Sequence, residues 1–71
     1  PNSKHREELL FLILKSSYLL ADNSIVEKQR ERFQSTVDEY YTFIGEFPNS
    51  QYVSEAKKMY EYSMDVLKKL N

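Results

Sequence analysis

The chain has 71 residues, with 10 basic and 11 acidic side chains and a formal net charge of −1, so it lacks the basic excess that usually marks a nucleic-acid-binding protein. It contains no cysteine and a single histidine, His5, which excludes disulfides and thiolate metal sites. A chain of this length buries only about 60% of its unfolded surface. With neither disulfides nor metal to stabilise it, we expect it to depend on packing against a partner.

The first predicted helix spans about residues 4–22 and is apolar almost all the way round. Ser3 is placed to cap its first turn. Its polar positions form a narrow strip spaced seven residues apart: Glu8, Lys15 and Asp22. Because a helix with so little polar surface is usually buried, we expect it to lie in the interior. The longest apolar run, residues 9–14, is far shorter than the roughly 18 residues of a membrane span.

Two further helices are predicted, over about residues 25–46 and 51–70. Ser24 and Glu27 match a capping box at the start of the first of these, and Ser50 is the expected cap of the other. At helical spacings, residues 25–46 carry the apolar stripe Phe33, Val37, Tyr40, Ile44 and Phe47. Residues 51–70 carry the stripe Val53, Ala56, Tyr60, Ser63, Leu67 and Leu70. We expect the two stripes to pack together, with the small Ala56 and Ser63 opposite large side chains.

The connection at residues 45–50 holds the only glycine, Gly45, and one of the two prolines, Pro48. Proline lacks an amide hydrogen and disfavours helical geometry in the residue before it, so the second helix must end near Phe47. A connection this short makes its two helices antiparallel neighbours, and the segment ADNS at residues 21–24 has the same effect. The fold class predicted is therefore all-α, with three antiparallel helices.

Helical hairpins closed by a proline are typical of tetratricopeptide repeats. Leu14 and Tyr18 stand four residues apart, as do the leucine and tyrosine of a repeat's first helix. Tyr40 precedes Pro48 by eight residues, as the large aromatic residue precedes the closing proline. Other positions depart from the pattern, because Lys15, Thr36 and Phe43 replace small residues.

The resemblance is closer to one group of these proteins. Residues 32–61 resemble the last repeats of the BamD family, the tetratricopeptide-like lipoproteins of the outer-membrane β-barrel assembly machinery. The segment that carries the resemblance is FIGEFPNSQYVSEA, residues 43–56. The upstream segment LILKSSYLLADNS also looks like the family's preceding helix.

This resemblance implies a single tetratricopeptide-like domain over residues 1–71, built as a helical hairpin plus one further helix and forming the C-terminal fragment of a longer repeat protein. It implies a non-catalytic scaffold on the periplasmic side of the outer membrane of a Gram-negative bacterium. The implied partners are the periplasmic domains of the barrel-inserting protein, with membrane contact only through an anchor upstream of this fragment. Two alternatives stay open: a generic tetratricopeptide adaptor with unrelated partners, and a helical appendage of an enzyme.

No constellation in the sequence points to catalysis, a metal or a cofactor. His5 has no second histidine or cysteine with which to share a metal. The adjacent acidic pairs Glu7–Glu8 and Asp38–Glu39 point about 100° apart on a helix, so neither pair converges on a substrate. We therefore expect no enzymatic activity, no metal site and no cofactor.

The candidate partner-binding residues are large apolar or aromatic side chains outside the two stripes. They are Phe11, Leu14 and Tyr18 on the far side of the first helix, with Tyr41, Phe43 and Tyr62 on the other two. For Tyr41, Phe43 and Tyr62 the alternative is packing at the rim of the core. Because residues 4–22 carry apolar side chains on opposite sides, we also expect the chain to self-associate through this helix.

Overall fold

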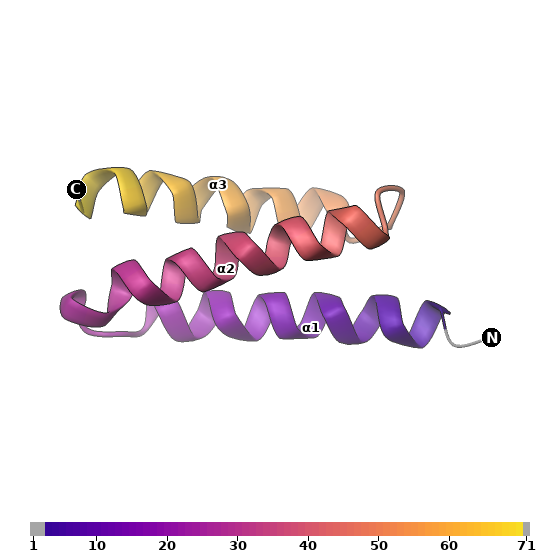
Figure 1. The fold of residues 1–71 in the computed structure, drawn as a ribbon, viewed down its shortest axis with the longest axis horizontal. Helices are drawn as coiled ribbons and strands as arrows, with labels where there is room; N and C mark the ends of the chain where they lie inside the picture. The colour runs from indigo at the N-terminus through magenta and orange to yellow at the C-terminus, as the bar shows by residue number, and fades with distance from the viewer. Residues whose placement is uncertain (1–2, 71) are drawn as a thin grey trace.

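The computed structural model describes residues 3–70, which form three antiparallel α-helices (Figure 1). Helix α1 covers Ser3–Asp22, α2 covers Val26–Glu46 and α3 covers Val53–Leu70. No described residue belongs to a β-strand. The prediction of an all-α fold of three antiparallel helices is confirmed.

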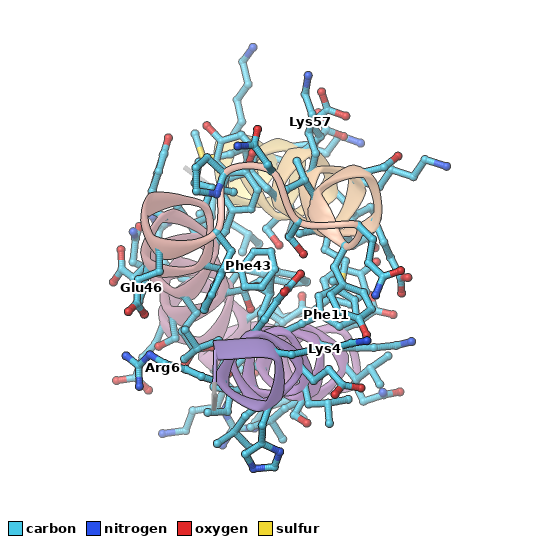
Figure 2. The ribbon with its side chains drawn as sticks, turned by 90° about the vertical axis from the view of Figure 1, so that its right-hand side faces the viewer. Lys4, Arg6, Phe11, Phe43, Glu46 and Lys57 are labelled. Atoms are coloured by element: carbon cyan, nitrogen blue, oxygen red, sulfur yellow. The ribbon has the colours of Figure 1, made fainter. Side chains whose placement is uncertain are left out.

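The three helices form a triangle when the bundle is viewed from its end (Figure 2), with α1 below and α2 and α3 above. Helix α2 contacts both neighbours, and its contact with α1 is more extensive than its contact with α3. The predicted division into a hairpin plus one further helix is therefore not borne out, because α1 and α2 share the largest interface.

The predicted capping box at Ser24 is wrong. The residue that precedes α2 is Ile25, which makes no side-chain capping hydrogen bond. The Ser24 hydroxyl instead donates to the carbonyl of Leu20 at 2.5 Å and accepts a hydrogen bond from Arg32 at 2.7 Å. The serine therefore closes the end of α1 and fixes a side chain of α2 against it.

Helix α3 begins at Val53, two residues later than expected. Ser50 still performs a capping role, because its hydroxyl oxygen accepts from the amide of Tyr52 at 3.0 Å and its carbonyl accepts from the amide of Val53 at 3.2 Å. The same hydroxyl donates to the carboxylate of Glu7 on α1. Ser50 thereby ties the connection to α1 and to the start of α3. The cap expected from Ser3 lies outside the described side chains.

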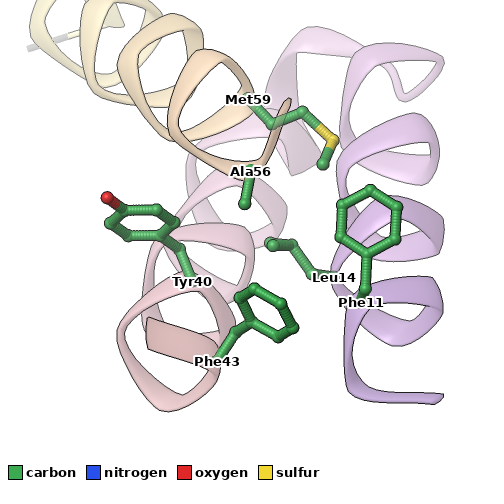
Figure 3. Packing of buried hydrophobic residues seen from close by; sticks show 6 residues of the cluster. All are labelled: Phe11, Leu14, Tyr40, Phe43, Ala56 and Met59. Carbon is green, nitrogen blue, oxygen red and sulfur yellow. The ribbon is translucent and has the colours of Figure 1, made fainter. Parts of the chain in front are cut away.

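The core is built from all three helices (Figure 3). Its buried hydrophobic cluster has two members from each helix: Phe11, Leu14, Tyr40, Phe43, Ala56 and Met59. The expected positions Ala56 and Ser63 are fully buried, but Ile44 is only half-buried and Phe43 occupies the centre. The buried residues of α2 therefore lie closer to α1 than the predicted stripe does. The reason is that α2 packs against both α1 and α3, and not against α3 alone.

Candidate interaction surfaces

Helix α1 presents its inner side to the core and not to a partner. Phe11 is 5% exposed and Leu14 is fully buried. The ring of Phe11 stacks on Tyr52 at a centroid distance of 4.5 Å and lies 6.0 Å from Phe43. The expectation that Phe11 and Leu14 form an uncovered face is therefore wrong, because the aromatic residues of α2 and of the α2–α3 connection cover them.

The opposite side of α1 is uncovered, so the expectation of an interior helix is also wrong. It consists of a serine among five aliphatic residues: Leu9, Leu12, Ile13, Ser16, Leu19 and Leu20. We call these six residues the outer face of α1. The exposed fractions of the five aliphatic residues run from 42% for Ile13 to 56% for Leu12. Nothing packs below α1 in Figure 2, so this face meets solvent in the single chain.

The remaining predicted residues differ in accessibility. Phe43 is fully buried, which overturns its placement on a binding surface: it lies between Phe11 and Phe47, with ring centroids 6.0 Å from each. Tyr18 is half-buried. Tyr41 and Tyr62 are 53% and 45% exposed, so part of each side chain stays accessible to solvent.

Tyr62 joins α3 to the C-terminal end of α1. Its hydroxyl donates to the carboxylate of Asp22 at 3.1 Å, and its ring meets Tyr18 and Phe33 edge-on at 5.8 and 5.9 Å. The hydrogen bond to Asp22, followed by the negative charge of that carboxylate, raises the pKa of Tyr62 above its ordinary value. The sequence alternative of rim packing describes this residue well, since its ring and hydroxyl are both engaged within the chain.

A groove of about 780 Å³ runs between α2 and α3. Its lining combines apolar and polar side chains from these two helices alone: Gln34, Val37, Tyr41, Tyr60, Glu61, Met64, Asp65, Leu67 and Lys68. We call it the α2–α3 groove. Because no residue of α1 lines it, the groove and the outer face of α1 are separate surfaces.

Tyr41 and Tyr60 form the aromatic wall of this groove, and the buried Tyr40 packs against both. Tyr40 and Tyr60 stack at 4.3 Å, while Tyr41 meets Tyr60 edge-on at 5.5 Å, and the hydroxyls of Tyr41 and Tyr60 lie 2.8 Å apart in a hydrogen bond. That hydrogen bond is the largest cause that raises the pKa of Tyr60, whereas burial raises the pKa of Tyr40. Contacts within the cluster therefore hold its rings in place.

The described residues show neither a candidate metal cluster nor a membrane-spanning helix. Within residues 3–70, no group of three or more histidine, cysteine, aspartate or glutamate side chains could hold a metal ion. His5 is exposed in the first turns of α1. None of the three described helices is both long enough and apolar enough to cross a membrane.

Sequence reasoning chose the wrong side of α1, although a signal was present. The side that proved to be buried carries Phe11, Leu14, Tyr18 and Ala21 without a small polar residue among them. The outer face has Ser16 at its centre. A hydroxyl at that position is easier to leave in water than to bury without a partner, so Ser16 indicated which side stays exposed. The groove was missed because Met64 was not assigned to any stripe.

Comparisons of the chain with protein-family models, with curated proteins and with solved structures find no match.

Proposed function

We propose that the chain is a non-catalytic protein-binding scaffold that receives a segment of its partner in the α2–α3 groove. The observation that carries this proposal is the exposed Tyr41 beside an open apolar groove between two antiparallel helices. Grooves of this kind accept amphipathic helices, whose apolar face replaces water along the groove floor.

The chemistry of the groove supports this use. Its apolar lining includes Val37, Met64 and Leu67, and methionine adapts its shape to different apolar partners. Its rim carries Glu61 and Lys68, which matches the usual plan of a protein interface with an apolar centre and a polar edge. Tyr41 is half-exposed, and an exposed tyrosine of this kind is a common anchor of binding energy.

The identity of the partner rests on the resemblance of residues 43–56 to the BamD family. On that basis we propose that the chain belongs to a tetratricopeptide-like lipoprotein on the periplasmic side of the outer membrane, and that its partners are the periplasmic domains of the barrel-inserting protein. The segment FIGEFPNSQYVSEA forms the end of α2, the connection and the start of α3. The alternative is a tetratricopeptide adaptor that uses the same groove for unrelated partners.

The test is calorimetric titration of the chain with the purified periplasmic domains of a barrel-inserting outer-membrane protein. We expect binding, and we expect Tyr41→Ala to weaken it about tenfold or more, as an anchor residue should. Tyr62→Ala is the matched control, because it removes an equally large tyrosine that does not line the groove. Far-UV circular dichroism would verify that both variants keep their helices.

Two results would count against this proposal. Binding that Tyr41→Ala leaves unchanged would place the docking surface elsewhere. A complete lack of binding by the unaltered chain would remove the assigned partner, and the adaptor alternative would then take its place.

A further inference from the structure

The outer face of α1 is palindromic about Ser16. Ile13 and Leu12 stand three and four positions before Ser16 on this face. Leu19 and Leu20 stand three and four positions after it, and all four are aliphatic. All four are between 42% and 56% exposed. Reversing the direction of the helix about Ser16 therefore places aliphatic residues on aliphatic residues.

We propose that this face is the interface with a second copy of the chain, in which the two α1 helices pack antiparallel and cross at Ser16. A two-fold axis makes an interface in which residue i meets residue j and j meets i. Here Leu12 of one copy meets Leu20 of the other, and Ile13 meets Leu19. The small side chain of Ser16 lies at the crossing point, where the two backbones come closest.

Charge favours this alignment over a parallel one. The outer face carries no charged side chain between Leu9 and Leu20, while Lys4 and His5 lie at its N-terminal end. A parallel pair would bring these basic residues of both copies together and align the two helix dipoles unfavourably. In the antiparallel pair, the basic residues of the two copies lie at opposite ends of the interface.

The size of the face sets the strength of the dimer. Both copies contribute five aliphatic side chains that are about half-exposed. A contact confined to five such side chains on each copy is smaller than most stable interfaces, which bury at least about 1,200 Å² in total. We therefore expect monomer and dimer to exchange at micromolar concentrations, and sedimentation equilibrium of the 71-residue chain measures this directly.

Cysteine crosslinking tests the alignment, because the chain has no cysteine of its own. In a glutathione redox buffer, we expect Ser16→Cys to form a disulfide-linked dimer, since residues at the crossing point meet the roughly 4.4–6.8 Å Cα separation of a disulfide. Ser54→Cys, at an exposed position of α3, is the matched control and should crosslink far less. Leu9→Cys should not link to its own copy, whereas a mixture of Leu12→Cys and Leu20→Cys should link.

A charged substitution tests the energetics without disturbing the core. Ser16 is exposed in the single chain, so Ser16→Glu should keep the helical circular dichroism while weakening the dimer about tenfold or more, because two like charges then meet on the axis. Ser54→Glu should leave the dimer unchanged. A chain that stays monomeric up to several hundred micromolar, Ser16→Cys that links no faster than Ser54→Cys, or Leu9→Cys that links to itself would each overturn the proposal.

The outer face of α1 and the α2–α3 groove are different surfaces, so the proposed dimer and the proposed partner binding can fail separately. A monomeric chain whose partner binding depends on Tyr41 would reject the dimer and keep the scaffold function. A dimer that Ser16→Glu dissociates, in a chain that does not bind the periplasmic domains, would keep the dimer and reject that partner.

Discussion

The two sides of α1 have similar apolar character and opposite environments. On the inner side Leu14 and Ala21 are fully buried, while on the outer face Leu12 and Leu20 are more than half exposed. The hydrophobicity of the two sides of α1 therefore does not explain which of them faces the core. What distinguishes the inner side is its two aromatic residues, Phe11 and Tyr18.

The partners of these two rings explain the choice. Phe11 stacks on Tyr52 and contacts Phe43, and Tyr18 meets Phe33 edge-on at 6.4 Å. Aromatic pairs in these geometries add roughly 0.5–1.5 kcal/mol beyond the area that they bury. The outer face is purely aliphatic apart from Ser16 and could form no such pairs with α2 or α3. Complementarity between helices, not the apolar content of one helix, therefore selects the buried side.

The largest test of this comparison is Phe43→Ala. Phe43 is fully buried and contacts Phe11 and Phe47. Truncating a buried phenylalanine costs about 3–5 kcal/mol, which is most of the stability of a domain this small. We expect the variant to be largely unfolded in a urea titration followed by circular dichroism. Tyr41→Ala, two residues earlier on the exposed side, is the control, and equal losses in the two variants would contradict the packing described above.

The sharpest test compares Leu14→Ala with Leu12→Ala, the same substitution two positions apart on α1. Leu14 is fully buried and should lose about 2–5 kcal/mol. Leu12 is 56% exposed and should lose less than about 0.5 kcal/mol, as surface substitutions usually do. Chemical denaturation well below micromolar concentration, where the monomer dominates, measures both. Similar losses would mean that the outer face is also covered.

The sequence predicted the helices better than their faces. Pro48 and the short connections placed the three helices within a few residues of their observed bounds, because proline geometry is a local property. The buried arc of α2 could not be placed in the same way. Whether Phe43 or Ile44 occupies the core depends on where α1 lies relative to α2, and no local spacing encodes that position. For the candidate surfaces, Tyr41 and Tyr62 were found as exposed residues, whereas Phe11, Leu14 and Phe43 were assigned to the wrong environment.

A smaller effect on stability is expected from the ion pair between Arg6 and Glu46, at the edge between the inner and outer sides of α1. Arg6 and Glu46 form a two-pronged ion pair, with Nε–Oε1 and Nη2–Oε2 distances of 3.1 and 3.0 Å, and both side chains are well exposed (Figure 2). Exposed pairs contribute about 0.2–1 kcal/mol. A double-mutant cycle of Arg6→Gln and Glu46→Gln should give a coupling energy in this range, and it should fall as salt screens the charges. A coupling above about 2 kcal/mol would show that this edge holds α1 in place more strongly than its core contacts suggest.

The smallest expected effect is a loss of stability at alkaline pH. It involves Tyr18 on the inner side of α1 and Tyr62 of α3, whereas the outer face of α1 has no titratable group. The hydrogen bond to Asp22 raises the folded-state pKa of Tyr62, and burial raises that of Tyr18. A raised pKa means that the folded state favours the neutral phenol, so the stabilisation is present below the unfolded value near pH 10 and is lost as pH rises through the folded value. We expect the melting temperature to fall progressively above pH 10. Tyr62→Phe cannot ionise at this position and should make the fall shallower, while Leu12→Ala should leave its slope unchanged. An equal slope in Tyr62→Phe and the unaltered chain would show that the contact with Asp22 does not couple ionisation to folding.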